Sequence, residues 1–540
     1  MSIICLRKRC SYWILSVFEY IHSENYLLYI RFYLLMKKSN NIRSVILASS
    51  VGTLIEWYDF YIFGSLAVVI STKFFPQDNP TAAFLSTLAT FAAGFVVRPF
   101  GALFFGRLGD LIGRKYTFLV TLLLMGGSTF LIGCVPSYET IGFFAPLLVL
   151  ILRLLQGLAL GGEYGGAATY VAEHSPANER GYWTSWIQTT ATAGLFISLL
   201  VILITRNLLG MEAFEDWGWR IPFWVSIIMV VVSFIIRRNM SESPVYSKMK
   251  AEGKVSVNPF KESFGNRYNF KFVLLALFGA VMGQGVVWYT GQFYAMSFIG
   301  KVCGVAGQQT DTIMAIALLL GTPFFIFFGK LSDSIGRKKI MMWGILLAVL
   351  SYRPIYNEIY KTIDVSKKTI VAEKIISKKG KLIPQTQDSI LTTITSISYS
   401  DNSLNELTVK DTLFKNGDIK PNKEIKKSIS LTTNHYWKLI LLVFIQIIFV
   451  TMVYGPIAAF LVEMFPAKIR YTSMSLPYHI GNGIFGGLLP TVATYLVTTA
   501  KTANQPEWYL NGLWYPIIVG AVCFVIGILF LKNDINHNND

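Results

Sequence analysis

The sequence is poor in charged residues and in cysteine. Only 15% of its 540 residues are charged, against about 25% in an ordinary soluble protein, and 53% are hydrophobic. This composition excludes most soluble folds. The five cysteines form no C-x-x-C pair and no zinc-ligand spacing, so no metal or redox centre is expected. No glycine-rich loop ends in G-K-[S/T], so neither a nucleotide site nor a cofactor is predicted.

Acidic residues are scarce relative to basic ones. Lys and Arg number 48 and Asp and Glu 31, which gives a formal charge of +17. In a soluble chain this excess would indicate nucleic-acid binding. In so apolar a chain it is typical of basic cytoplasmic loops that face anionic lipid, so the expected partner is the bilayer and not nucleic acid.

Long apolar runs are abundant. A helix needs about 20 apolar residues to cross a bilayer, and the chain offers twelve such runs. They predict an all-α membrane protein with twelve transmembrane helices in two six-helix bundles. The predicted parts are an N-terminal bundle (36–238), a cytoplasmic central loop (239–270), a C-terminal bundle (271–531) and a cytoplasmic tail (532–540).

Two motifs occur twice. GRLGDLIGRK at Gly106–Lys115 follows the second run, and GKLSDSIGRK at Gly329–Lys338 follows the eighth. The pattern E-x-x-P-x-x-x-R begins at Glu173 after the fourth run and at Glu463 after the tenth. We interpret the chain as one six-helix unit used twice in parallel, about an axis along the membrane normal.

Two segments fall outside this repeat. Residues 1–35 contain interrupted apolar runs and no signal-peptide cleavage site, and are interpreted as an extension before a start at Met36 or as an interfacial amphipathic segment. The second half has 134 positions between its two motifs where the first has 67. The excess lies in an insertion at 355–435, whose short β-prone pieces predict an appended module or a partly ordered loop.

Basic residues in the short loops predict the orientation. They follow the second and eighth runs, which places those loops in the cytoplasm. Both termini are then cytoplasmic and the insertion is extracytoplasmic, because long loops cross the membrane largely regardless of charge.

Ionisable residues inside the runs are the first candidates for function, because lipid makes charge costly. Glu56 and Asp59 share a face of the first helix, and two such close carboxylates suit proton binding and release. In the fourth helix Arg153, Gln156 and Glu163 form one polar stripe, and Arg153 is positioned to pair with Asp59. The predicted proton-coupling residues are Asp59, Glu56, Arg153 and Glu163. The alternative is a permanent structural ion pair.

Polar and aromatic residues predict a substrate cavity. The seventh run and the glycine- and proline-interrupted eleventh run both suit a binding site, although the aromatic residues and the histidine are also typical of packing. The predicted cavity residues are Tyr58, Arg153, Gln156, Gln284, Trp288, Tyr289, Gln292 and His479.

The repeated motifs predict a gate on the cytoplasmic side. Their charges are placed for contacts between helix ends that form in one conformation and break in another, or that act as a static clamp. The symmetric pairs expected from spacing are Glu173 with Arg180 and Glu463 with Arg470. The predicted gate residues are Gly106, Asp110, Gly113, Arg114, Glu173, Arg180, Asp333, Gly336, Arg337, Glu463 and Arg470.

Four segments resemble a known family. They are EWYDF (56–60), RPFGALFFGRLGDLIGRK (98–115), RLLQGLALGGEYGG (153–166) and ESPVY (242–246). The chain is similar over 40–353 and 437–531 to the major facilitator superfamily, and within it to the metabolite:proton symporters, which include proline/betaine, α-ketoglutarate, citrate and shikimate carriers. The resemblance implies two bundles with a central site and alternating access. It also implies a monomer in a bacterial inner membrane that transports its substrate without enzymatic turnover.

The sequence therefore predicts a secondary transporter that imports a small polar metabolite together with protons. The alternatives are an exporter or uniporter on the same fold, or a transporter-like sensor that uses the 355–435 insertion. No nucleophile, metal-ligand set or cofactor motif points to an enzyme.

Overall fold

A computed structural model describes residues 42–76, 80–238, 240–366, 368–382, 389–413, 419–420 and 425–532. The predictions for residues 1–35, and for all but the first residue of the 532–540 tail, lie outside these ranges. The first half of the described chain is helical. Its helices are α2 (Ile42–Ser65), α3 (Ala67–Phe74), α4 (Pro80–Ile112), α5 (Arg114–Cys134), α6 (Tyr138–Ile141), α7 (Phe144–His174), α8 (Arg180–Leu209), α9 (Met211–Ala213) and α10 (Arg220–Arg238).

The second half repeats this arrangement after a connecting helix, α11 (Pro244–Ala251). It also contains a five-stranded sheet. Its elements are α12 (Arg267–Ala276), α13 (Met282–Tyr289), α14 (Ala295–Ser297), α15 (Gly307–Ile335), α16 (Arg337–Ile363), β1 (Ile370–Leu382), β2 (Ser389–Tyr399), β3 (Leu404–Leu413), β4 (Ile419–Lys420), β5 (Ile425–Ser430), α17 (Thr433–Met464), α18 (Arg470–Ile480), α19 (Leu489–Thr502) and α20 (Trp514–Phe530).

The helices account for the twelve predicted spans. Within the described ranges nine continuous helical segments are long and apolar enough to cross a membrane, and α2 with α3 forms a further span bent by 64°. Among the nine, π-helical turns join α12 to α14 into one segment, Arg267–Val302, and α18 to α19 into Arg470–Thr502. The other two predicted spans correspond to α4, with 33 residues, and α16, with 27, which are not among these segments. The predicted all-α membrane fold is confirmed.

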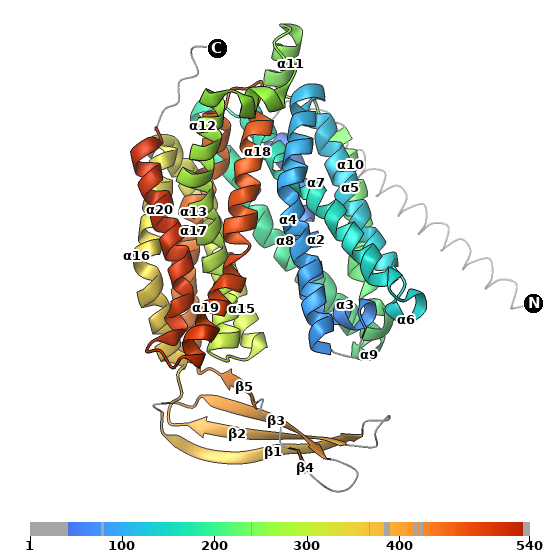
Figure 1. Cartoon of the computed structure of the whole chain (residues 1–540), viewed down its shortest axis with the longest axis vertical. Helices are drawn as coiled ribbons and strands as arrows, with labels where there is room; N and C mark the ends of the chain where they lie inside the picture. The colour runs from blue at the N-terminus through green and yellow to red at the C-terminus, as the bar shows by residue number, and fades with distance from the viewer. Residues whose placement is uncertain are drawn as a thin grey trace, which may run out of the picture.

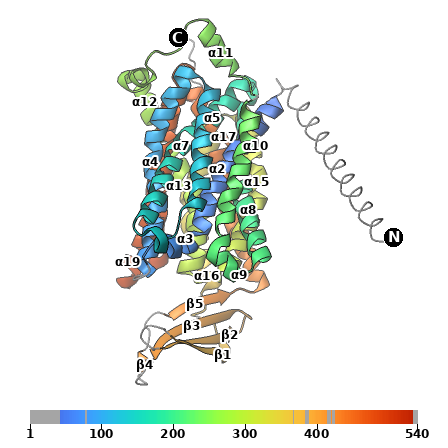
Figure 2. The same cartoon turned by 90° about the vertical axis from the view of Figure 1, so that its right-hand side faces the viewer.

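The spans form two bundles that stand side by side (Figure 1). The N-terminal bundle contains α2 to α10 and the C-terminal bundle α12 to α20. The bundles contact each other through α8 on α15 and α4 on α18. Both views place α11 beyond one end of the bundles and the sheet beyond the other, and we call these the α11 end and the sheet end (Figures 1 and 2).

The insertion folds as an antiparallel sheet. Its strand order is β1-β2-β3-β4, and β5 pairs with β3. Ile397, Asn405 and Ile429 stand opposite one another on β2, β3 and β5. These three side chains are buried, and Ile429 belongs to the apolar core of the C-terminal bundle.

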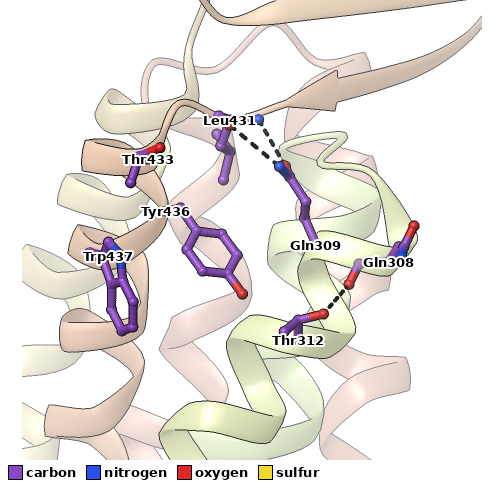
Figure 3. A pocket seen from close by; sticks show the side chains of 7 residues that line it. All are labelled: Gln308, Gln309, Thr312, Leu431, Thr433, Tyr436 and Trp437. Atoms are coloured by element: carbon purple, nitrogen blue, oxygen red, sulfur yellow. Dashed lines mark hydrogen bonds between the residues drawn. The ribbon is translucent and has the colours of Figure 1, made fainter.

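Main-chain hydrogen bonds attach the sheet to the loop between α14 and α15. The Ile429 nitrogen donates to the Gly304 oxygen at 2.7 Å, and the Ala306 nitrogen donates to the Ile429 oxygen at 2.9 Å. Next to this bridge the Gln309 side chain bonds both the nitrogen and the oxygen of Leu431, at 2.8 and 3.4 Å (Figure 3). The sheet is therefore continuous with the C-terminal bundle.

The boundaries of the insertion differ from the predicted ones. The ninth span, predicted to end before the insertion at 355, continues as α16 to Ile363, and Pro354 lies inside this helix. The tenth helix begins at Thr433. The sequence pattern ended the helix too early because residues 353–363 mix Arg, Glu and Lys with Pro. Ile355, Tyr356 and Ile359 nevertheless pack inward as a helical face.

Candidate functional site

A chain of hydrogen bonds links Asp59 to Arg153 inside the N-terminal bundle. The Thr129 hydroxyl donates to Asp59 Oδ2 at 2.7 Å and accepts a bond from the Gln156 amide nitrogen. Arg153 Nη1 donates to Gln156 Oε1 at 2.7 Å. All four side chains are buried. The contact predicted between Asp59 and Arg153 thus runs through α5, by way of a threonine that the sequence did not single out.

Glu163 forms an ion pair with Arg237, separately from the Asp59–Arg153 chain. Arg237 at the end of α10 binds both carboxylate oxygens of Glu163, and Thr121 donates to Oε2 at 2.8 Å. The Arg237 guanidinium also lies 3.5 Å from the centre of the Phe118 ring. The ion pair is almost fully buried, with both side chains 1% exposed.

Glu56 and Asp59 each keep a buried oxygen that is not satisfied. Glu56 Oε2 and Asp59 Oδ1 have no hydrogen-bond partner among the residues that the structure describes. Of the three acidic residues in the predicted coupling set, Glu56 and Asp59 are therefore the two with an unsatisfied carboxylate oxygen among the described residues.

Aromatic rings from both bundles meet near these carboxylates. Trp57, next to Glu56 in the chain, lies 5.4 Å from Trp288 of α13 between ring centres. Tyr164 of α7 stacks on Tyr478 of α18 at 3.7 Å, and the Tyr478 hydroxyl bonds that of Tyr454 at 2.7 Å. We call these rings the aromatic layer; Trp288 lies 5.5 Å from Phe293, which lines a cavity between the bundles.

The cavity lies between the bundles in the half nearer the sheet. Its volume is about 430 Å³, and α2, α8, the segment Thr290–Ser297 and α15 line it. Phe60, Tyr61 and Phe293 contribute aromatic surface, and Gln292 contributes an amide. Its two charged lining residues are Arg206 and Asp311.

The predicted cavity residues separate into groups. Gln292 lines the cavity, and Trp288 and Tyr289 pack against Phe293 at its inner end. The other predicted side chains do not line the cavity. They are Tyr58, Arg153, Gln156, Gln284 and His479, and they are buried. Tyr58 donates to the Pro222 oxygen at 2.9 Å, and Gln284 exchanges bonds with Asn482 at 2.9 and 3.1 Å. His479 is buried in α18.

At the α11 end, the first copy of the repeated motif bridges the two bundles. Asp110 of α4 accepts bonds from the nitrogen and the hydroxyl of Thr472, at 2.8 and 2.7 Å, at the start of α18. Arg114 pairs with Asp110 at 3.0 Å and donates to the Ala467 oxygen at 2.9 Å. The motif therefore holds the end of one bundle against the first turn of a helix in the other.

The second copy makes the matching contacts. Asp333 of α15 accepts bonds from the nitrogens of Gly181 and Tyr182, both at 2.8 Å, at the start of α8. Arg337 pairs with Asp333 and, at 3.1 Å, with Glu463. Each aspartate thus lies at a helix N-terminus of the opposite bundle, where the helix dipole favours negative charge.

The E-x-x-P-x-x-x-R partners are exchanged relative to the prediction. Glu173 pairs with Arg470 at 3.0 Å, and Arg180 lies 3.9 Å from Glu463. The expected pairs within one motif are replaced by pairs between bundles, because the two motifs face each other across the pseudo-symmetry axis.

Two predicted gate glycines have backbone angles that other residues rarely adopt. Gly113 and Gly336, at the starts of α5 and α16, have φ angles of 120° and 106°. Gly106 serves close packing instead, since a Cβ there would lie 3.0 Å from Thr472 Cα.

The sequence did not single out several residues that complete these clusters. Arg237 stands at the end of a span, where a basic residue is typical of a cytoplasmic flank. Glu242, within ESPVY, accepts bonds from the nitrogens of Arg114 and Lys115, both at 3.2 Å. The Arg98 guanidinium, within the longest matching segment, lies 4.3 Å from the Phe95 ring centre and 5.8 Å from that of Phe60. For Arg237 and Arg98, a charge next to or inside an apolar run was the available signal.

No group of three potential metal ligands occurs among the described residues. Two six-helix bundles, closed against each other at one end and separated by a cavity toward the other, define a membrane transporter. The family comparisons agree with this class. Residues 45–256 match the family Sugar (and other) transporter, and residues 166–356 match MFS/sugar transport protein.

Curated relatives are more specific. The chain is 38% identical over 328 residues to the inner membrane metabolite transport protein YhjE of Escherichia coli K12, covering 58% of this chain and 73% of that protein. It is 27% identical over 504 residues to the proline/betaine transporter of the same strain, covering 90% and 83%. It is 28% identical over 485 residues to the α-ketoglutarate permease, also of that strain, covering 90% and 92%. The chain belongs to the major facilitator superfamily, in its metabolite transporter group.

Solved structures share the fold. A double tryptophan mutant of XylE superposes with a TM-score of 0.67 at 16% identity, covering 92% of this chain and 96% of that one. The proton:xylose symporter XylE bound to 6-bromo-6-deoxy-D-glucose gives 0.64 at 15% identity, with the same coverage.

Proposed function

We propose that the protein imports a small polar metabolite together with protons, by alternating access. The observation that carries this proposal is the pair of buried carboxylates, Glu56 and Asp59, each with an unsatisfied oxygen. An unsatisfied buried carboxylate is costly when ionised, so it gains from binding a proton. The chain Asp59–Thr129–Gln156–Arg153 connects this proton site to a cation and couples its charge state to the helices around it.

The substrate is an organic acid or a zwitterion of the betaine or proline type. Arg98 and Arg153 supply positive charge near the centre of the molecule. The aromatic layer around Trp57 and Trp288 supplies the ring faces that attract a quaternary or secondary ammonium group. Relatives named for proline/betaine and for α-ketoglutarate support both chemistries.

The conformation supports an outward-facing state. The sheet end is the extracytoplasmic end in this proposal, both termini are cytoplasmic, and the protein works as a monomer in an inner membrane. The cavity then faces the outside, and the cross-bundle contacts of Asp110 and Asp333 form the closed cytoplasmic gate.

The test is transport by Asp59→Asn in membrane vesicles. The neutral variant is expected to lose substrate accumulation driven by an inward proton gradient and to keep downhill exchange. Asp216→Asn is the matched control, because Asp216 is an exposed aspartate of the same bundle. If Asp59→Asn still concentrates substrate as the wild type does, the proton assignment is wrong.

Counterflow with radiolabelled organic acids and betaines identifies the substrate. Alkalinisation of the outside medium during uptake separates proton symport from uniport and from export.

A further inference from the structure

Arg206 and Asp311 face the same cavity from opposite bundles. Arg206 is on α8 of the N-terminal bundle and Asp311 on α15 of the C-terminal bundle. Within the part of the chain that the structure describes, neither takes part in an ion pair. Arg206 Nε is buried without a hydrogen-bond partner there, and its guanidinium lies 4.9 Å from the Phe214 ring centre. The cavity therefore holds one positive and one negative charge that do not neutralise each other in this conformation.

Helices α8 and α15 touch at the α11 end and diverge toward the sheet end. Near the α11 end there is no room for a side chain at Gly329, because a Cβ there would overlap Ser185 of α8. Toward the sheet end, one face of each helix borders the cavity. These faces carry Leu195, Leu199, Ile202 and Arg206 on α8, and Asp311, Met314, Ala315 and Leu318 on α15. Each charged residue is the outermost member of its face.

The two charges lie at nearly the same height above the point of contact. Arg206 is 21 residues from Ser185, and Asp311 is 18 residues from Gly329. At 1.5 Å per residue these separations are about 31 and 27 Å, a difference of less than one helical turn. If the two helices rotate together about their contact, the apolar side chains between them close first on one another, and Arg206 meets Asp311 at the rim.

We propose that Arg206 and Asp311 form an ion pair that closes the sheet-end mouth of the cavity when the α11 end opens. This inference rests on the proposed alternating access. In the conformation that is open at the α11 end, the Arg206–Asp311 pair would connect the two bundles. It would offset the loss of Glu173–Arg470 and Arg180–Glu463, which break when the bundles separate at that end. The lining between the pair and the aromatic layer is largely apolar, so closure also excludes water from the cavity.

The proposal is tested by cross-linking a cysteine pair, Arg206→Cys with Asp311→Cys, in full-length protein whose native cysteines are replaced. A short bifunctional thiol reagent is applied to membranes with and without Glu173→Gln, which weakens the α11-end contact. The cross-linking rate is expected to rise about fivefold or more with Glu173→Gln. Lys73→Cys with Asp216→Cys is the control pair, because both residues belong to one bundle, where Lys73 Nζ lies 3.5 Å from Asp216 Oδ1. The cross-linking rate of this pair is expected to stay constant. An unchanged rate for the Arg206 and Asp311 pair overturns the proposal.

Charge exchange provides a second readout that needs no cross-linking. Arg206→Asp and Asp311→Arg are each expected to reduce uptake, and the double variant to recover most of it. Failure of the double variant to recover, with an altered apparent affinity for substrate, would mean that the residues bind substrate and do not form the proposed pair. If the wild type shows no proton-driven uptake but the cross-link still depends on Glu173→Gln, the proposed function fails and the pairing stands.

Discussion

Glu173 of the N-terminal bundle and Arg470 of the C-terminal bundle form an ion pair of 3.0 Å at the α11 end. Glu173 is 1% exposed and Arg470 is 11% exposed, so water screens the pair weakly. Glu173 also accepts a bond from Ser243 and lies 3.6 Å from Arg114, so it joins both bundles to the segment that connects them.

Glu173→Gln is expected to make the α11 end open more often, because it removes the charge that holds Arg470 and Arg114. A loss of one to two kcal/mol raises the open population about 5- to 30-fold. The measurement is the labelling rate of a cysteine placed at Ser475, which is buried in α18 against Gly165 of α7. Glu252→Gln is the control, since its partners Lys254 and Lys248 are 73% and 79% exposed and exposed pairs contribute little. Equal labelling in Glu173→Gln and the control would show that the pair does not hold this end closed.

Glu163→Gln is expected to destabilise the N-terminal bundle strongly. It leaves Arg237 buried without its counter-charge, and removing one partner of a buried pair costs about 3–5 kcal/mol. The thermal unfolding midpoint in detergent measures the loss. The double variant Glu163→Leu, Arg237→Leu is expected to lose less than Glu163→Gln, because it removes both charges. If the loss in the double variant equals the sum of the losses in the single variants Glu163→Leu and Arg237→Leu, the two residues are not coupled.

Gly336→Ala and Gly113→Ala separate backbone strain from a steric clash. Both positions have positive φ angles, and an alanine there costs about 1–3 kcal/mol in strain. A Cβ at Gly336 meets nothing within 4 Å, whereas one at Gly113 overlaps the Glu242 carboxylate that binds the first nitrogens of α5. Gly113→Ala is therefore expected to lower the unfolding midpoint by more than Gly336→Ala. Equal shifts would mean that the Glu242 contact contributes little.

The fold was predictable because its signals are long and repeated. Twelve apolar runs and two copies of a ten-residue motif specify the spans and their pseudo-symmetry, since a membrane imposes the same length on each helix. The end of α16 was not predictable in the same way. Its last turns leave the apolar run, and inward packing of Tyr356 and Ile359 keeps them helical.

The sequence identified individual residues of the candidate site, but it did not predict which side chains they contact. The cost of charge in lipid pointed to Glu56, Asp59, Arg153 and Glu163. Their partners come from other helices, as Thr129 and Arg237 do, and sequence spacing within one helix carries no information about them. For the same reason spacing paired Glu173 with Arg180 within one motif, although the structure pairs it with Arg470 of the other bundle.

Asp401 is expected to make the stability of the sheet depend on pH. It lies in the turn between β2 and β3, where Lys368 binds it at 2.7 Å and the Ser403 nitrogen and hydroxyl bind it at 3.0 and 2.5 Å. Partial burial opposes ionisation, but these bonds outweigh it and lower the Asp401 pKa from 3.8 to about 2. A lowered pKa contributes stability that is fully present above about 3.8 and is lost as the pH falls toward 2. Hydrogen–deuterium exchange of the β2 and β3 peptides in the full-length protein is therefore expected to accelerate over this interval.

Asp401→Asn removes the charge at every pH and is the matched control for that experiment. Because the pair with Lys368 is partly exposed, the variant is expected to exchange at pH 5 about fivefold faster at most. Its rate, corrected for intrinsic exchange, is expected to converge with that of the wild type below pH 2, where most of the wild-type carboxylate is also neutral. A wild-type loss of protection that Asp401→Asn reproduces unchanged would assign the pH dependence to another carboxylate of the sheet.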